Sequence, residues 1–119
     1  WYPGTGSASD RGPHGTVWNV PMAAGLEPSL YVQALLAAVD EATVGFTPDV
    51  VLVSAGFDCL AGDPLGGFTL TDNEIRILTH ALVERAERWC AGRLVSALEG
   101  GYAPEAVAQA VMVHLKALA

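Results

Sequence analysis

Two short, continuous apolar segments constrain the fold of this chain more than any other feature. They are residues 50–55 (VVLVSA) and residues 94–98 (LVSAL), and neither alternates between polar and apolar side chains. Continuous apolar runs are typical of parallel strands that helices cover on both faces. We therefore expect an α/β protein whose parallel sheet lies in the middle of three α/β/α layers.

Three segments with helical spacing accompany these strands. The first begins near Pro28 and ends before Gly45, and the second opens with a capping box at residues 71–74 and ends at Gly92. The third begins near Pro104. The apolar side chains expected on the buried faces of the last two helices are Ile75, Leu78, Leu82, Ala86, Trp89, Val107, Val111 and Leu115.

The segment before the first helix predicts a loop and one more strand. Residues 1–15 are rich in Gly and Pro, whereas residues 16–20 (TVWNV) have the composition of a short strand that ends at Pro21. The expected order is a loop followed by β-α-β-α-β-α. Because the chain has 119 residues, it has room for one core, and we expect a single domain unit over residues 1–119.

Composition excludes several classes of protein. The chain has 6 Lys+Arg against 13 Asp+Glu, a net charge of −7, yet 51% of its residues are hydrophobic. A disordered acidic tail would be less hydrophobic, and a nucleic-acid binder would cluster its cations. No apolar run approaches the roughly 18 residues that cross a bilayer, so we expect no membrane segment. Cys59 and Cys90 form no CxxC motif, which favours a reducing cytoplasm.

A carboxylate follows the first apolar run, in the kind of loop where open parallel sheets bind ligands. Asp58 lies just beyond residues 50–55, where burying a carboxylate is costly unless it is paired or bound to a metal. The residues leave two interpretations open: Asp58 binds a metal, or it accepts hydrogen bonds from loop amides. Asp63, which precedes Pro64, predicts a turn.

Two glycines and a tyrosine follow the second apolar run. Gly100 and Gly101 allow the backbone to approach a ligand closely, so we expect them to contribute to substrate binding. The phenol of Tyr102 can donate a hydrogen bond to a developing oxyanion. The alternative is a tyrosine that packs on the rim of the sheet.

The remaining motifs are weaker. His14, His80 and His114 have no metal-ligand spacing and are expected to be surface or core residues. Cys59 has no recognisable histidine partner for nucleophilic catalysis. A generic nucleotide-binding domain would rest on fold alone, because the GTGSAS segment at residues 4–9 lacks the third glycine of the dinucleotide fingerprint.

Four motifs together resemble the zinc-dependent histone deacetylase family. They are WYPGTG at residues 1–6, NVP at 19–21, SAGFDCLAGDPLGGF at 54–68 and LEGGY at 98–102. The EGGY form is more similar to class II deacetylases and bacterial acetylpolyamine amidohydrolases than to class I enzymes. The resemblance implies an arginase/deacetylase-like fold, of which this chain is the C-terminal portion.

The resemblance also implies roles for individual residues. Asp58 matches a zinc ligand, and Tyr102 matches the tyrosine that polarises the acetyl carbonyl and stabilises the oxyanion. Tyr2 and Leu65 match walls of the acyl-lysine channel, whereas Leu60 stands where class II-like members often have His. The implied reaction is hydrolysis of an acetyl-lysine or acetylpolyamine amide, with water activated by zinc.

The family's Asp-x-His zinc ligands and its paired histidines lie upstream of the motif at which this chain starts. Because one carboxylate cannot hold a catalytic zinc, we expect the isolated chain to bind zinc weakly and to be inactive. The family's sheet order implies that residues 50–55 present an open apolar edge and that residues 16–20 have no partner. Such edges recruit other chains, so we expect a homo-oligomer. The alternative function is a non-catalytic scaffold or binding module.

Overall fold

The two apolar runs pair with each other as neighbouring parallel strands. The structure, a computed structural model, describes residues 4–119. Strand β1 (Val51–Ala55) and strand β2 (Leu94–Leu98) are in register from the pair Val51 and Leu94 to the pair Ala55 and Leu98. Helix α1 (Pro28–Ala42) precedes β1, helix α2 (Asp72–Cys90) connects the strands, and helix α3 (Pro104–Leu118) follows β2. The expected parallel α/β fold is confirmed.

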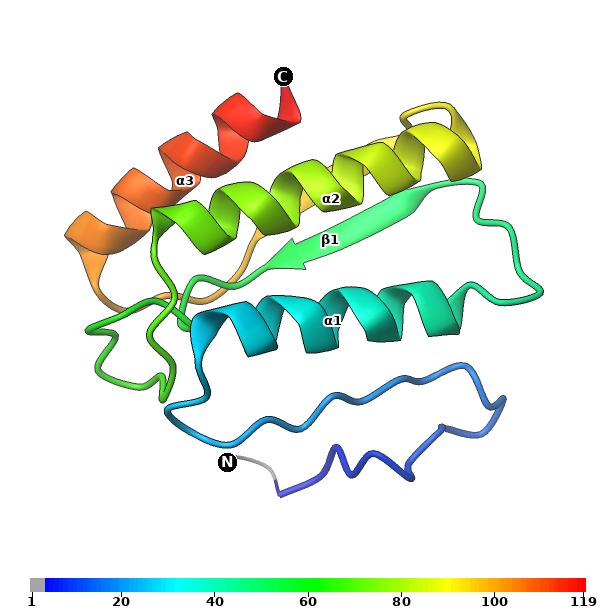
Figure 1. Ribbon diagram of the computed structural model, residues 1–119, viewed down its shortest axis with the longest axis horizontal. Helices are drawn as coiled ribbons and strands as arrows, with labels where there is room; N and C mark the ends of the chain where they lie inside the picture. The colour runs from blue at the N-terminus through cyan, green and yellow to red at the C-terminus, as the bar shows by residue number, and fades with distance from the viewer. Residues whose placement is uncertain (1–3) are drawn as a thin grey trace.

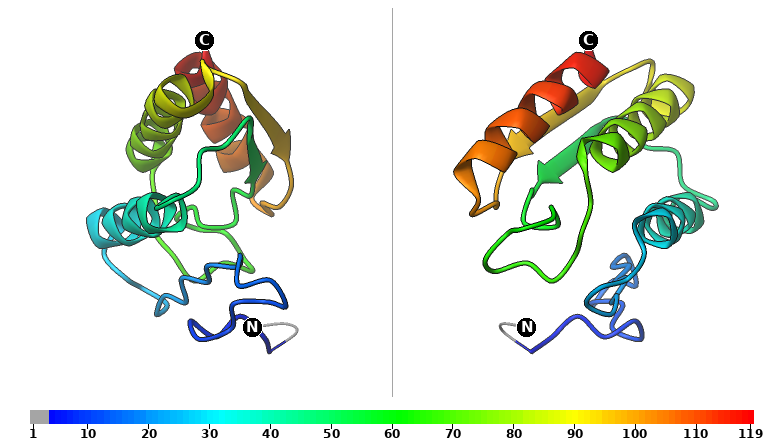
Figure 2. Two further views of the ribbon diagram at one scale, coloured as in Figure 1. Left: turned by 90° about the vertical axis from the view of Figure 1, so that its right-hand side faces the viewer. Right: turned by 60° about the vertical axis from the view of Figure 1, so that its left-hand side comes forward.

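The helices lie on one side of the sheet, as the left view of Figure 2 shows. In β1, half-buried side chains alternate with exposed ones, and Leu52 is 73% exposed. In β2, Val95 is 59% exposed. We call the side chains of Leu52, Ser54, Val95 and Ala97 the uncovered face of the sheet. Within residues 4–119, the structure therefore contains the sheet and the helical layer on one of its faces.

The strand predicted over residues 16–20 is wrong, because this segment has no strand conformation in the structure. Hydrogen bonds to residues 7–11 hold this segment in place instead. Val17 N–H donates to the Arg11 carbonyl, and the Asn19 amide donates to the carbonyls of Ser7 and Asp10. A strand requires a neighbour for its backbone groups, and α1 separates this segment from β1 in the chain.

Local signals set the bounds of α2 and α3. The Glu74 carboxylate accepts from the Thr71 N–H, and the Thr71 hydroxyl accepts from the Asn73 N–H, as the capping box predicts. At the other end of α2, Ala91 adopts the left-handed conformation just before Gly92. Helix α3 has Pro104 in its first turn, where its missing N–H costs nothing.

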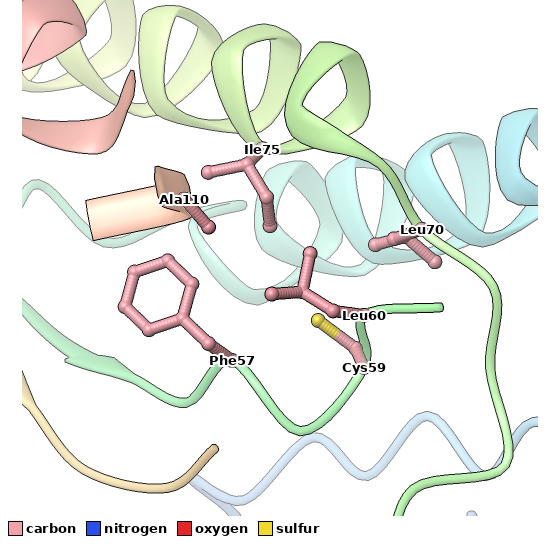
Figure 3. Close-up of a cluster of buried hydrophobic side chains, with 6 residues drawn as sticks. All are labelled: Phe57, Cys59, Leu60, Leu70, Ile75 and Ala110. Atoms are coloured by element: carbon pink, nitrogen blue, oxygen red, sulfur yellow. The ribbon is translucent and has the colours of Figure 1, made fainter. Parts of the chain in front are cut away.

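The buried hydrophobic cluster lies directly behind the loop that follows β1. Figure 3 shows its six side chains, which come from that loop, α2 and α3: Phe57, Cys59, Leu60, Leu70, Ile75 and Ala110. Leu60 and Leu70 form an isolated parallel bridge that closes the loop on itself. The loop thus contributes to the core as well as to the edge of the sheet.

The predicted buried face of α3 is partly wrong. Leu115 is 52% exposed, whereas Ala110, His114 and Ala117 are buried. His114 replaces an apolar residue in this face because both of its ring nitrogens have hydrogen-bond partners. Nδ1 lies 2.8 Å from the Thr79 hydroxyl, and Nε2 lies 2.8 Å from the Ser96 hydroxyl.

None of the helices in residues 4–119 is both long enough and apolar enough to cross a bilayer.

Candidate active site

The two predicted site loops lie side by side because their strands are neighbours. Both follow the carboxyl end of a strand, at the arrowhead end of β1 in Figure 1. Glu99 N–H donates to the Ala55 carbonyl over 3.0 Å, and Phe57 N–H donates to the Gly100 carbonyl over 2.9 Å. These two bonds continue the pairing of the strands into the loops, so residues far apart in sequence meet at one edge.

The carboxylate of Asp58 and the hydroxyl of Tyr102 converge on Gly100. A Cβ atom added to Gly100 would lie 2.9 Å from Asp58 Oδ2 and 3.7 Å from the Tyr102 hydroxyl. Both functional groups therefore border the same small space, which a side chain at position 100 would fill. A carboxylate and a phenol around a glycine backbone can hold a cation and a polar substrate atom next to each other.

Asp58 is exposed in the structure. Within residues 4–119, no backbone amide donates to its carboxylate, so the loop-capping interpretation does not describe this side chain. Its carboxylate is available to a ligand. Its backbone is closely packed, because a Cβ at Gly66 would overlap the Asp58 carbonyl oxygen.

Tyr102 and Gly101 differ in how they are surrounded. The Tyr102 side chain is 51% exposed, so it is not packed away on the rim. Gly101 has a φ of 128°, and a Cβ there would lie 2.6 Å from Val107 Cγ2 and 3.1 Å from Phe57 Cβ. Glycine is thus required at position 101 for both conformation and space.

The structure describes one of the two residues, Leu65 and Tyr2, that were predicted to line the acyl-lysine channel. Leu65 lies in the loop after β1 with 56% of its surface exposed, as a rim position requires. Tyr2 lies outside the residues that the structure describes.

Asp63 is a site residue whose main contact the sequence did not reveal. Its Oδ1 atom accepts from the N–H groups of Leu65 and Gly66 over 2.9 and 2.8 Å, which is the predicted turn. Its Oδ2 atom also accepts from the Tyr102 N–H over 2.6 Å, across 39 positions of sequence. Burial favours the neutral acid, but the three N–H donors outweigh it and lower the pKa of Asp63. No local pattern could have indicated the bond to Tyr102.

The donor set of the described residues does not fit a catalytic zinc by itself. Residues 4–119 contain no cluster of three or more His, Cys, Asp or Glu side chains that could hold a metal ion. His14 and His80 are exposed, and His114 is bonded within the core. Asp58 is thus one possible ligand of the three that a catalytic zinc usually takes from protein.

Cys59 does not supply an alternative nucleophile. The thiol is buried, and burial raises its pKa to about 11. At neutral pH it is therefore protonated, and the thiolate is the reactive form.

The chain is of the parallel α/β class of proteins, in which ligands bind at the carboxyl edge of the sheet. Comparison with known proteins identifies the family within this class. The family profile described as "Histone deacetylase domain" matches residues 1–118. The chain belongs to the histone deacetylase family.

Individual relatives agree with this assignment. The chain is 36% identical over 104 residues to "Type-2 histone deacetylase 1" of Dictyostelium discoideum, and 40% identical over 93 residues to "Histone deacetylase-like amidohydrolase" of Pseudomonas aeruginosa. These alignments cover 87% and 78% of this chain. A crystal structure of the HDA15 HD domain superimposes with a TM-score of 0.86 at 34% identity, over 99% of this chain.

The chain spans a minor part of each of these proteins. It covers 7% of the Dictyostelium relative, 24% of the Pseudomonas relative and 33% of the HDA15 chain. It therefore corresponds to part of a deacetylase domain, with the arginase/deacetylase fold of its structural neighbours.

Proposed function

We propose that this chain forms the C-terminal part of a deacetylase catalytic domain and supplies two side chains to its active site. Asp58 acts as a metal ligand and Tyr102 as a hydrogen-bond donor to the substrate. The observation that carries the proposal is the convergence of the Asp58 carboxylate and the Tyr102 hydroxyl on the space beside Gly100.

The substrate that fits this arrangement is an acetylated amine, such as acetyl-lysine or an acetylpolyamine. The Tyr102 hydroxyl donates to the acyl carbonyl oxygen, and this hydrogen bond strengthens as negative charge develops there in the transition state. Gly100 leaves room for the acyl group beside the backbone, whereas the space beside Gly101 is filled by Val107 and Phe57 of this chain, so the expected contribution of Gly101 to substrate binding is limited to the backbone conformation that it allows. The amide bond is hydrolysed, and the products are a free amine and acetate.

The metal of this site is zinc, and its remaining ligands come from polypeptide outside residues 4–119. Two facts support this part of the proposal: membership of the deacetylase family, and the single carboxylate that the described loops present. The isolated chain is accordingly expected to bind zinc weakly and to be inactive.

The test is hydrolysis of an acetyl-lysine reporter, measured for the isolated chain and for the longest natural polypeptide that contains it. In that polypeptide, Tyr102→Phe should lower kcat about 100- to 1,000-fold, as expected for loss of an oxyanion donor. Tyr31→Phe is the matched control, because it removes the same hydroxyl from α1, where the ring packs edge-on against Phe68. Full activity of the Tyr102→Phe variant would contradict the proposal.

Added zinc and a chelator complete this experiment. Activity of the longer polypeptide should be lost with the chelator and return with zinc. Chelator-sensitive turnover by the isolated chain, abolished by Tyr102→Phe, would mean that copies of the chain assemble a working site. It would contradict the expected inactivity.

The uncovered face supports a second candidate function, a non-catalytic oligomeric module. On this face, Leu52 and Val95 are 73% and 59% exposed. Next to β1, an apolar groove runs between α1 and α2, and its walls include Val39, Phe46, Val50, Leu52 and Leu82. We propose that a second copy covers these surfaces when the chain is isolated. A monodisperse monomer in light scattering at micromolar concentration would refute the homo-oligomer.

The cytoplasm is the proposed compartment. Cys59 and Cys90 are both free and buried, as suits a protein that does not depend on disulfides. Two plant relatives carry the word "chloroplastic" in their names. Fractionation of the source cells decides between these compartments, and recovery in an organelle fraction would contradict the cytoplasm.

A further inference from the structure

We propose that Asp63 is a positioning residue for deacetylation: its buried carboxylate joins the loops after β1 and β2 and thereby fixes where the Tyr102 hydroxyl lies. This inference rests on the proposed function, because it concerns the reaction in which Tyr102 takes part. The atoms nearest to a Cβ at Gly100 belong to Asp58 and Tyr102, and Asp63 acts through its bond to the Tyr102 backbone.

The first step of the argument is how the two carboxylate oxygens divide their partners. Oδ1 accepts from two amides of its own loop, at Leu65 and Gly66. Among residues 4–119, Oδ2 accepts only from the Tyr102 amide, in the neighbouring loop, at 2.6 Å. One side chain therefore fixes the position of Tyr102 relative to the loop that carries Asp58.

The second step is that this role requires a carboxylate. All three partners are N–H donors, so both oxygens must accept. Hydrogen bonds to an ionised oxygen are shorter and stronger than neutral ones. The residue is 8% exposed, so water cannot easily replace a lost partner. An asparagine at this position would turn its NH₂ group toward at least one of these amides.

The third step is that few other contacts fix Tyr102. Its side chain is half exposed, so packing constrains its ring only partly. The loop is attached at Gly100, which accepts from the Phe57 N–H, and again where α3 begins at Pro104. Between these points, the Asp63 carboxylate is the hydrogen-bond partner of the Tyr102 backbone. Without it, the phenol would sample a wider range of positions.

The first test needs no enzymatic activity. In the isolated chain labelled with ¹⁵N and ¹³C, NMR should detect a scalar coupling across the hydrogen bond between the Tyr102 amide nitrogen and the Asp63 carboxyl carbon. The Tyr102 amide should also exchange with solvent at least about tenfold more slowly in the native chain than in Asp63→Asn. Equal exchange rates in both, or no coupling, would overturn the proposal.

The second test is a double-mutant cycle on kcat in the longest natural polypeptide that contains the chain. Asp63→Asn should lower kcat about 10- to 100-fold, the cost of misplacing a reacting group, and change KM less than about threefold. In the Tyr102→Phe background, the same substitution should lower kcat less than about twofold, because the hydroxyl that it positions is gone. Asp40→Asn is the matched control, since Asp40 also accepts two hydrogen bonds, from Arg85 on α2, away from the site loops.

The outcomes separate this inference from the proposed function. If the fold-losses in kcat from Asp63→Asn and Tyr102→Phe multiply in full in the double variant, Asp63 is a structural residue only and the inference is wrong. Tyr102 then remains a catalytic residue. If Tyr102→Phe leaves kcat unchanged, the proposed function is wrong. If Asp63→Asn fails to fold, the coupling and the exchange rate in the native chain still decide whether the contact exists.

Discussion

The carboxyl edge of the sheet and its uncovered face differ in how completely their groups are partnered. At the edge, backbone bonds join the two loops, Asp63 accepts three N–H groups, and Gly66 stands where no Cβ fits. On the uncovered face, Leu52 and Val95 are mostly exposed. Burying side chains of this size contributes about 1.5–3 kcal/mol each. Polar contacts at the edge are thus formed within the chain, whereas the apolar face offers surface for further polypeptide.

The largest effect is expected from disrupting the edge at Gly66. Gly66→Ala places a Cβ against the carbonyl oxygen of Asp58, which is backbone and cannot rotate away. The substitution should lower the free energy of unfolding by about 2–4 kcal/mol, measured by urea denaturation.

Gly100→Ala is the matched control for this prediction. Its Cβ would meet Asp58 Oδ2, the mobile end of a side chain. We expect a loss below about 1 kcal/mol, because the carboxylate can move aside. Equal losses for the two variants would show that the edge is no more closely packed than its surroundings.

A smaller effect is expected from substitutions on the uncovered face, and it concerns self-association of the chain. The double substitution Leu52→Ser and Val95→Thr should weaken self-association of the isolated chain about tenfold or more, since each removes apolar surface from the contact. It should change the stability of each subunit by less than about 1 kcal/mol, because both side chains are exposed. Analytical ultracentrifugation measures the first quantity and urea denaturation the second. An unchanged association constant in the double variant would show that the chain does not associate through the uncovered face.

The smallest effect on the free energy of unfolding is expected from a change in pH, which acts on His114 in the core behind the carboxyl edge of the sheet. Burial lowers the pKa of His114 below its ordinary value of 6.5. The Thr79 hydroxyl donates to the Ile75 carbonyl, so it accepts from Nδ1–H, and Nε2 accepts from Ser96 in the neutral ring. The unfolded chain therefore binds this proton more readily, and stability should fall as the pH falls from about 6.5 toward the lower folded pKa.

The measurement is the urea midpoint at pH 7.5 and pH 5.5 for the native chain and for two variants. His114→Gln should reduce the loss between these values, because the buried titrating group is gone. His80→Gln, in the exposed part of α2, should retain the loss. If all three proteins lose stability equally, His114 has no part in the pH dependence.

Much of the fold could be predicted because its signals are local. The apolar runs mark β1 and β2, the capping box marks the start of α2, and Pro104 marks the start of α3. Asp58 and Tyr102 were candidates because they follow those runs, and paired parallel strands bring their loops together. Their roles in the reaction stay predictions, since they come from resemblance to the deacetylase family.

The tertiary structure decided what depends on contacts between distant segments. Residues 16–20 have the composition of a strand but no neighbour with which to pair. Leu115 has the hydropathy of a core residue and is half exposed, whereas its neighbour His114 is buried with both ring nitrogens hydrogen-bonded. The bond from Tyr102 to Asp63 spans 39 positions and leaves no pattern in the sequence. Local propensity and periodicity are read along the chain, whereas a hydrogen bond or a buried contact exists only where folding brings its two partners together.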